Sequence, residues 1–187
     1  FQSLPRILAI ANQKGGVGKT TTTINLATAL AAVRKRVLVV DLDPQGNAST
    51  GLGLLKADRQ VNSYHVLIGE ADVANACLDT DVPGLAAMPS GTDLAGAEIE
   101  LVDVNDRLHR LKAAMAGQVE QYDYVLIDCP PALGLLTINA LIAADSVLVP
   151  LQCEFFALEG ISQLVRTINR VRNAYNPTLD IQGLSLI

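Results

Sequence analysis

The sequence predicts an α/β domain in which a mostly parallel, doubly wound sheet is flanked by helices. Continuous apolar runs at residues 7–11, 37–40 and 124–127 lack alternating polar positions, which is typical of parallel strands buried on both faces. Segments with helical spacing alternate with these runs, as helices do when they connect parallel strands. With 187 residues, half of them hydrophobic, the chain is long enough for one domain with a substantial core.

The remaining elements follow from local patterns. Small polar residues and glycines at 45–53 predict a loop, and Asn62 or Ser63 is a suitable N-cap for a short helix. We expect strands at residues 85–88, 146–150 and 181–187, helices at 24–30, 63–68, 73–78, 93–102, 106–115, 135–144 and 159–174, and a loop at 151–158.

Composition narrows the class of protein. No apolar run approaches 18 residues, so the sequence predicts no membrane span. The three cysteines, Cys77, Cys129 and Cys153, are far apart and form no C-x-x-C pair, which favours a reducing, cytoplasmic compartment over a metal cluster. A formal net charge of -5 gives no overall electrostatic attraction for nucleic acid.

The ends of the chain give two further expectations. Residues 1–3 lack an initiating methionine and resemble the remnant of a protease site from recombinant expression. Residues 4–187 are expected to form a single domain. The sequence stops inside the apolar run at 181–187, from which we expect a C-terminal part of the domain to be missing.

The most informative segment is the glycine-rich turn at residues 14–20, between the first strand and the first helix. Its backbone N–H groups can surround a polyphosphate, Lys19 supplies positive charge for the β and γ oxygens, and the Thr20 hydroxyl can bind Mg²⁺. The usual pattern, G-x-x-x-x-G-K-[ST], would place glycine at position 13, where this chain has Gln13 followed by Lys14. Lys19 already serves its own subunit's phosphates, so Lys14 could serve those of a neighbour.

Acidic residues follow two other predicted strands. Asp41 and Asp43 end the run at 37–43, and Asp128 ends the run at 124–128. Ligands gather at the carboxyl ends of such strands. Triphosphate hydrolysis needs a Mg²⁺ ion, held by protein ligands, to neutralise the β and γ oxygens, and a group that orients the attacking water. Thr20 and Asp128 suit the metal and Asp43 suits the water, but Asp41 competes for that role, and aspartate before proline is also common turn chemistry.

Three motifs, at residues 14–20, 41–47 and 126–131, resemble those of the deviant Walker A group of P-loop NTPases, and specifically the ParA/Soj chromosome-partitioning proteins. The segment at 155–160 strengthens this resemblance. It implies ATP and Mg²⁺ as cofactors, catalytic roles for Lys14, Lys19 and Asp43, and metal binding by Thr20 and Asp128. The implied nucleotide-binding residues are Lys14, Gly15, Gly16, Val17, Gly18, Lys19, Thr20 and Thr21.

The resemblance also implies partners. Such proteins form ATP-dependent homodimers that bind DNA without sequence preference, and a ParB-type centromere-binding protein stimulates hydrolysis. It therefore implies a cytoplasmic, nucleoid-associated ATPase switch for chromosome or plasmid segregation, with no membrane contact and with DNA-contact residues mostly beyond this sequence. The alternative is a membrane-associated positioning ATPase of the MinD type, which would use an amphipathic C-terminal helix. A small-molecule ligase such as dethiobiotin synthetase would not need Lys14.

Overall fold

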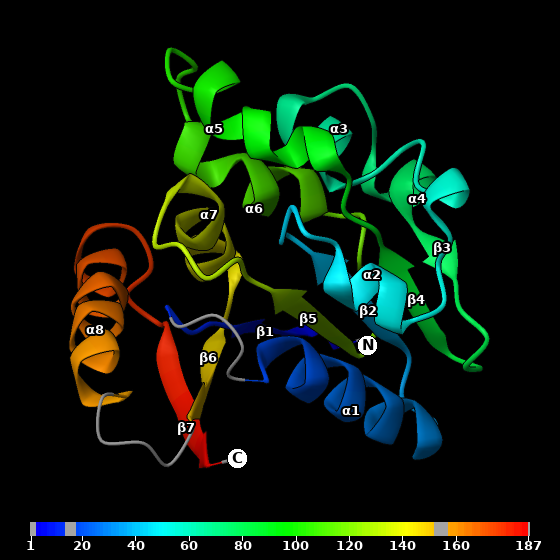
Figure 1. Ribbon diagram of the computed structural model, residues 1–187, viewed down its shortest axis with the longest axis horizontal. Helices are drawn as coiled ribbons and strands as arrows, with labels where there is room; N and C mark the ends of the chain where they lie inside the picture. The colour runs from blue at the N-terminus through cyan, green and yellow to red at the C-terminus, as the bar shows by residue number, and fades with distance from the viewer. Residues whose placement is uncertain (1–2, 14–17, 152–156, 187) are drawn as a thin grey trace.

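The computed structural model describes residues 3–13, 18–151 and 157–186, whose strands form one seven-stranded sheet with the order β3-β4-β2-β5-β1-β6-β7 (Figure 1). All neighbouring strands run parallel except β3 and β4, which are antiparallel. The mostly parallel fold is therefore confirmed. The strands are β1 (Arg6–Ile10), β2 (Val37–Asp41), β3 (Leu78–Asp79), β4 (Leu85–Met88), β5 (Tyr124–Asp128), β6 (Ser146–Leu151) and β7 (Asp180–Leu186).

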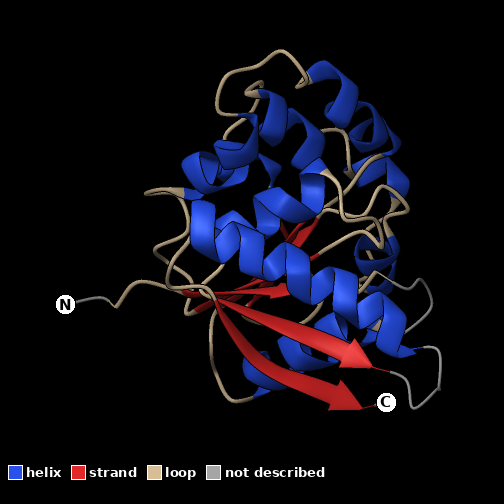
Figure 2. Cartoon of the chain, turned by 90° about the vertical axis from the view of Figure 1, so that its left-hand side faces the viewer, coloured by secondary structure: helices blue, strands red, loops and turns tan. Residues whose placement is uncertain are grey.

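Helices cover both faces of the sheet. Successive strand residues point to opposite faces, so strands that are apolar throughout need a helical layer on each side. Ala9, Val40 and Ile127 belong to the core beneath α3 (Ser63–Ile68), α5 (Ala97–Glu100), α6 (Arg110–Met115), α7 (Leu135–Ala143) and α8 (Ala157–Ala174). Ile10 and Val39 belong to a second core beneath α1 (Lys19–Ala32) and α2 (Asn47–Gly51). Figure 2 shows α8 packed over the β6 and β7 edge.

Several boundaries match the sequence closely. The strands predicted at 85–88 and 124–128 are β4 and β5, and the helix predicted at 63–68 is α3. Asn62 is its N-cap: the side chain accepts a hydrogen bond from the Tyr64 N–H at 2.9 Å, and His65 completes a capping box by accepting the Asn62 N–H at 3.2 Å. This exchange satisfies backbone donors that a helix start otherwise leaves open.

The loop predicted at 45–53 is wrong, because residues 47–51 form α2. Its N-cap, Gly46, has φ 67, a left-handed conformation that glycine adopts without a Cβ penalty. Ser49 is tied to Asp41, and Thr50 accepts a hydrogen bond from Arg59 at 2.9 Å. Tertiary contacts therefore stabilise a helix that small polar residues do not predict.

The helices predicted at 73–78, 93–102 and 106–115 are shorter or interrupted. Helix α4 (Val73–Ala76) ends early and Leu78 enters β3. The other two segments contain the 3₁₀ helices η2 (Thr92–Gly96) and η3 (Arg107–His109) before α5 and α6. Asp106 has φ 63, which is incompatible with a continuous helix at that point. A further 3₁₀ helix, η1 (Lys56–Asp58), follows α2.

Within the described residues, no helix is both long enough and apolar enough to cross a membrane.

Candidate active site

The structure brings the predicted strand ends together. Strand β5 lies between β1 and β2, and its last residue, Asp128, is in register with both Ile10 and Asp41. The carboxyl ends of β1, β2 and β5 therefore meet at one edge of the sheet, where the chain continues into the glycine-rich turn, the segment after Asp41 and the segment after Asp128. This is the edge at which open parallel sheets bind ligands.

Helix α1 begins at this edge and presents its N-terminus to it. Its N-cap, Gly18, has φ 76, and the helix proper starts at Lys19. Among the described residues, no side chain caps this end, and no acidic residue lies in the first turn. The free N–H groups and the positive end of the helix dipole are thus left without a negative partner from the first turn, which suits a bound phosphate.

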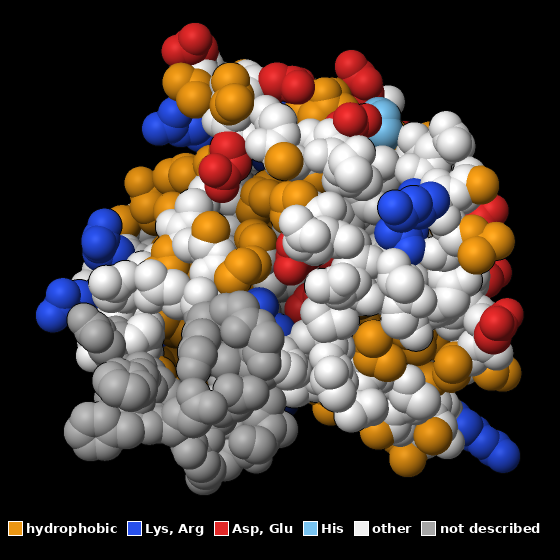
Figure 3. Space-filling view, in the orientation of Figure 1, with side chains coloured by type: hydrophobic (Ala, Val, Ile, Leu, Met, Phe, Trp, Pro, Cys, Tyr) orange, Lys and Arg blue, Asp and Glu red, His pale blue; other side chains and the backbone are white. Residues whose placement is uncertain are grey.

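A cavity of about 410 Å³, which we call the nucleotide cavity, opens beside the start of α1. It is lined by Gly18, Lys19, Thr20, Thr21, Asp43, Gln45, Asn47 and Pro131. Acidic and basic side chains lie together in a hollow near the middle of this face (Figure 3). Lys19 is only 6% exposed. The sequence did not single out Gln45, Asn47 or Pro131, although all three lie within the second and third motifs.

Asp128 is held by two threonines of α1. The Thr20 hydroxyl donates to Asp128 Oδ2 at 2.9 Å, and the Thr23 hydroxyl lies 3.3 Å from Oδ1 and 2.9 Å from the Lys19 carbonyl oxygen. Thr23 was missed, but its position three residues after Thr20 places both hydroxyls on one helix face. Burial, and secondarily the charge of Asp41, raises the pKa of Asp128 to about 7. A nearby cation would stabilise the ionised form of this carboxyl group and lower its pKa.

These oxygen donors fit Mg²⁺. A hydroxyl and a carboxylate within hydrogen-bonding distance are ligands that Mg²⁺ accepts, and it usually completes its shell with water and phosphate oxygens rather than with a protein cage. Among the described residues, no group of three or more His, Cys, Asp or Glu side chains could hold a metal ion. Thr20 and Asp128 would therefore hold the ion together with a bound nucleotide.

The two aspartates at the end of β2 and just beyond it, Asp41 and Asp43, have different surroundings. Both Asp41 oxygens are occupied: Oδ1 accepts the Asp43 N–H at 3.0 Å, and Oδ2 accepts the Ser49 N–H and hydroxyl at 2.9 and 2.6 Å. Asp43 lines the nucleotide cavity. Its Oδ1 accepts the Gln45 N–H at 3.0 Å in an Asx turn, whereas its Oδ2 accepts no hydrogen bond from the described residues. Asp43 therefore stabilises the turn through Oδ1 and keeps Oδ2 available to a ligand in the nucleotide cavity.

Three buried serines fix this pair, and sequence reasoning missed their role. Ser49 accepts the Ser90 N–H at 3.0 Å while donating to Asp41, Ser63 donates to the Asp41 carbonyl at 2.8 Å, and Ser90 donates to the Asp43 carbonyl at 2.6 Å. They come from α2, α3 and the segment after β4, so no local pattern links them. Ser63 and Ser90 therefore hold the backbone carbonyls of Asp41 and Asp43, and Ser49 holds the Asp41 side chain.

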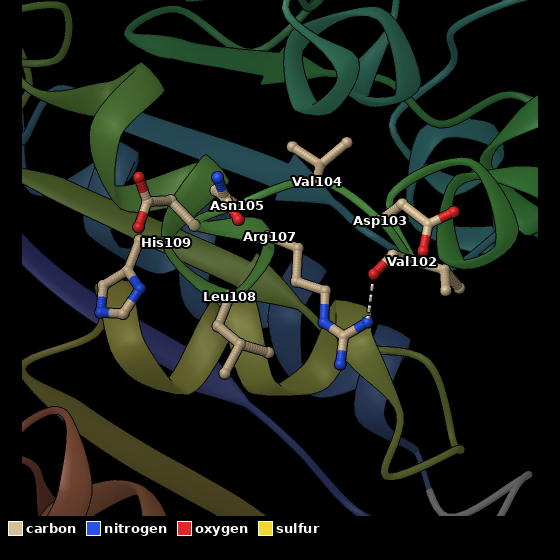
Figure 4. Close-up of a pocket in the computed structure, with 8 residues that line it drawn as sticks. Val102, Asp103, Val104, Asn105, Arg107, Leu108 and His109 are labelled. Atoms are coloured by element: carbon tan, nitrogen blue, oxygen red, sulfur yellow. Dashed lines mark hydrogen bonds between the residues drawn. The ribbon is translucent and has the colours of Figure 1, made fainter.

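Some predicted residues lie elsewhere. Lys14, Gly15, Gly16 and Val17 are outside the described residues, as is Cys153. Cys129 is fully buried beside Asp128, and burial raises the pKa of its thiol well above the usual range, which makes it unreactive. Another cavity, of about 440 Å³, is lined by Val102–His109, where the Arg107 guanidinium donates to the Val102 carbonyl at 2.6 Å (Figure 4). It contains none of the predicted site residues.

Comparison with known proteins identifies the family. A family model described as an AAA domain matches residues 5–181. The chromosome partitioning protein ParA of Caulobacter vibrioides is 59% identical over 183 residues, which cover 97% of this chain and 68% of that protein. The chain belongs to the ParA/Soj family. Another member, the sporulation initiation inhibitor protein Soj of Bacillus subtilis, is 54% identical over 97% of this chain and 72% of its own length.

Solved structures place the ParA/Soj fold among nucleotide-binding proteins. A cobyrinic acid a,c-diamide synthase from Mycobacterium smegmatis, solved with ADP and magnesium, superposes with a TM-score of 0.94 and 45% identity over 98% of this chain and 74% of that one. As a ParA/Soj protein, this chain is a P-loop ATPase.

The serine and arginine contacts around α2 predict an unequal response to two glycine substitutions. Gly46→Ala and Gly117→Ala both place a side chain at positive φ, which costs about 1 kcal/mol. A Cβ at Gly46 would also lie 2.8 Å from Arg59 Nη1, whereas a Cβ at Gly117 would have no neighbour within 4 Å in the part of the chain that the structure describes. We expect thermal unfolding to show the larger destabilisation for Gly46→Ala. Equal losses would show that Arg59 yields without cost.

Asp128→Asn is expected to alter the pH dependence of stability in nucleotide-free protein. The folded protein keeps the Asp128 proton up to about pH 7, whereas the unfolded chain releases it near a pKa of about 3.9. Between these values the folded state binds the extra proton, so the free energy of unfolding falls as pH rises. The variant lacks this loss, so its melting temperature relative to that of the unmodified protein should rise between about pH 4 and about pH 7 and stay level above that range. Melting curves with a chelator measure this, and parallel pH profiles would contradict it.

Proposed function

We propose that this protein is an ATP-driven switch for chromosome or plasmid segregation, which dimerises on ATP, binds DNA without sequence preference and hydrolyses ATP when a ParB-type partner stimulates it. The observation that carries the proposal is that Lys19, Thr20 and Asp43 line one cavity, with Thr20 donating a hydrogen bond to the buried Asp128, in a chain of the ParA/Soj family.

Each residue has a proposed part in the chemistry. The N–H groups at the start of α1 and the Lys19 ammonium bind the β- and γ-phosphates, with Thr21 as a further phosphate contact. Thr20 and Asp128 hold Mg²⁺, which neutralises phosphate charge when bound. Asp43 orients the attacking water through its available oxygen, and Asp41 with the three serines keeps Asp43 in place. These residues lie on strand ends and helix starts, which are rigid supports for such geometry.

Lys14 has its proposed role across the dimer interface. Lys19 lies in the nucleotide cavity of its own subunit, so a second lysine five residues earlier is available for the γ-phosphate of the partner. A cation supplied in this way acts like an arginine finger, which accelerates hydrolysis by about 10³ to 10⁵ in other phosphate-loop enzymes. Hydrolysis then depends on dimerisation, and ATP favours the dimer only because it binds the dimer more tightly.

DNA binding follows from the same linkage. Two subunits joined by ATP present twice the phosphate contacts of one, and the second set binds at a high effective concentration. Because the whole chain carries a net charge of -5, these contacts require a local basic surface. Affinity for DNA should therefore fall steeply with salt, and a flat salt dependence measured by fluorescence anisotropy would contradict binding through the phosphate backbone.

A phosphate-release assay tests the proposed function. ATP turnover should be weak with protein alone and should rise when DNA and the ParB-type partner are added together. Because the Mycobacterium smegmatis relative is named for an amide-forming synthase, a parallel reaction with its corrin substrate and an amide donor is the informative comparison. Turnover that responds to those substrates and ignores DNA and partner would overturn the proposal.

A further inference from the structure

A second polar cavity borders the nucleotide cavity, and the proposed chemistry does not use it. It measures about 530 Å³ and is lined by Gln45, Lys56, Arg59, Gln60, His65 and Asp93, with Ser90 also contributing. We call it the basic cavity. Gln45 lines both cavities. The short segment that carries Asp43, Pro44 and Gln45 therefore separates the proposed site of hydrolysis from a second space.

The basic cavity has an excess of positive charge and hydrogen-bond donors. Lys56 and Arg59 are cationic, and Asp93 is the one acidic side chain among the residues that line it. His65 Nδ1 accepts the Asn62 N–H, so a neutral His65 ring carries its hydrogen on Nε2 and is a further donor. In a chain of net charge -5, such a group favours an anion.

Arg59 is the anchored member of the group. Its Nη2 donates to the Thr50 hydroxyl at 2.9 Å and to the Leu54 carbonyl at 2.6 Å, which fixes the guanidinium against the segment after α2. Its Nε is buried and has no hydrogen-bond partner among the described residues. The two anchoring contacts hold the guanidinium beside the basic cavity that Arg59 lines, so its positive charge is pre-organised for an anion there.

The basic cavity is linked by hydrogen bonds to Asp43. Ser90, which contributes to its lining, donates to the Asp43 carbonyl at 2.6 Å, and the Gln45 N–H donates to Asp43 Oδ1 at 3.0 Å. An anion in this cavity would therefore lie against the residues that hold the proposed water-orienting acid. The anion that the proposed reaction itself generates next to Asp43 is inorganic phosphate.

We propose that the basic cavity binds the inorganic phosphate released by hydrolysis and provides its exit on the side of Asp43 away from the nucleotide. The inference rests on the proposed function, because a dimer closed over the nucleotide would block exit through the shared face. Phosphate offers several acceptor oxygens and, near neutral pH, carries a mixture of single and double negative charge, which match Arg59, Lys56 and the amide donors of Gln45 and Gln60. The 530 Å³ space also accommodates bound water.

Titration of inorganic phosphate into the full protein saturated with MgADP tests the site, with ³¹P NMR or calorimetry as readout. We expect saturable binding that Lys56→Gln weakens and that Arg59→Gln weakens about tenfold, the effect of losing one charge-assisted hydrogen bond. Lys35→Gln makes the same charge change at an exposed residue outside the basic cavity and should leave binding unchanged. Arg59→Gln also removes the hydrogen bonds that Arg59 makes to Thr50 and Leu54, so it could disturb the fold. Lys56 is exposed, and Lys56→Gln is therefore the variant that leaves the fold intact.

Two results would overturn the inference: phosphate affinity equal in the unmodified, Lys56→Gln and Arg59→Gln proteins, or no saturable binding to any of them. Neither depends on hydrolysis, DNA or partner. If the unmodified protein binds phosphate in the basic cavity but DNA and the ParB-type partner do not stimulate its ATP turnover, the proposed function is contradicted and the phosphate site is not. In turnover experiments, inhibition of ATP hydrolysis by added phosphate should weaken in Lys56→Gln and remain in Lys35→Gln. If the inhibition is unchanged in both variants, phosphate does not leave through the basic cavity.

Discussion

Asp43→Ala is expected to lower stimulated ATP hydrolysis by about 10² or more, the contribution of a positioned acid or base, while ATP binding remains. Asp43 lines the nucleotide cavity with one oxygen unused by the described residues. Its removal takes away the water-orienting group without touching Lys19 or the Thr20–Asp128 pair. The variant should accumulate as an ATP dimer on DNA. Phosphate release and DNA retention, measured on the same preparation, check both effects.

Asp41→Ala is the matched control, because it deletes the neighbouring carboxylate. Burial raises the pKa of Asp41, yet its oxygens accept the Asp43 N–H and both Ser49 donors. We expect a loss of stability of about 1–3 kcal/mol for each buried donor left without an acceptor, visible as a lower melting temperature. If Asp43→Ala hydrolyses ATP at the normal rate, Asp41 or another group orients the water.

Lys14→Ala is the second substitution from which we expect a large loss of stimulated ATP hydrolysis. We expect ATP binding to be largely retained, because Lys19 and the start of α1 bind the phosphates within one subunit, whereas stimulated turnover should fall by about 10³ to 10⁵, as when an arginine finger is lost. Lys19→Ala should instead lose ATP binding itself. A fluorescent ATP analogue measures binding, and sedimentation measures the dimer. Normal stimulated hydrolysis in Lys14→Ala would contradict a role across the interface.

Much of the sheet could be predicted from the sequence because its strands are continuous apolar runs. The residues of β4 and β5 were predicted to the residue, and the acids at Asp41 and Asp128 mark the ends of their strands. What the sequence left out depends on contacts between distant segments. Helix α2 forms from small polar residues because Asp41 and Arg59 bind Ser49 and Thr50. Strand β3 has only two residues, too few for a period to be visible.

The candidate site shows the same division. The ends of β1, β2 and β5 could be predicted because each lies in a local motif. The sequence favoured Asp43 without excluding Asp41, since both lie at the carboxyl end of the same buried strand. That difference lies in hydrogen bonds from Ser49 and Gln45, and in the placement of Asp43 in the cavity. Ser90 and Arg59 were missed because they reach the site from other parts of the chain.

Mixing two inactive variants tests most directly the claim that each active site is completed by the other subunit. A Lys14→Ala subunit keeps its own Lys19 and Asp43, and an Asp43→Ala subunit can still donate Lys14. If Lys14 acts across the interface, an equal mixture should regain about a quarter of the stimulated hydrolysis, since about half of the dimers are mixed and each has one complete site. If the mixture stays as inactive as either variant alone, Lys14 acts within its own subunit and the account is contradicted.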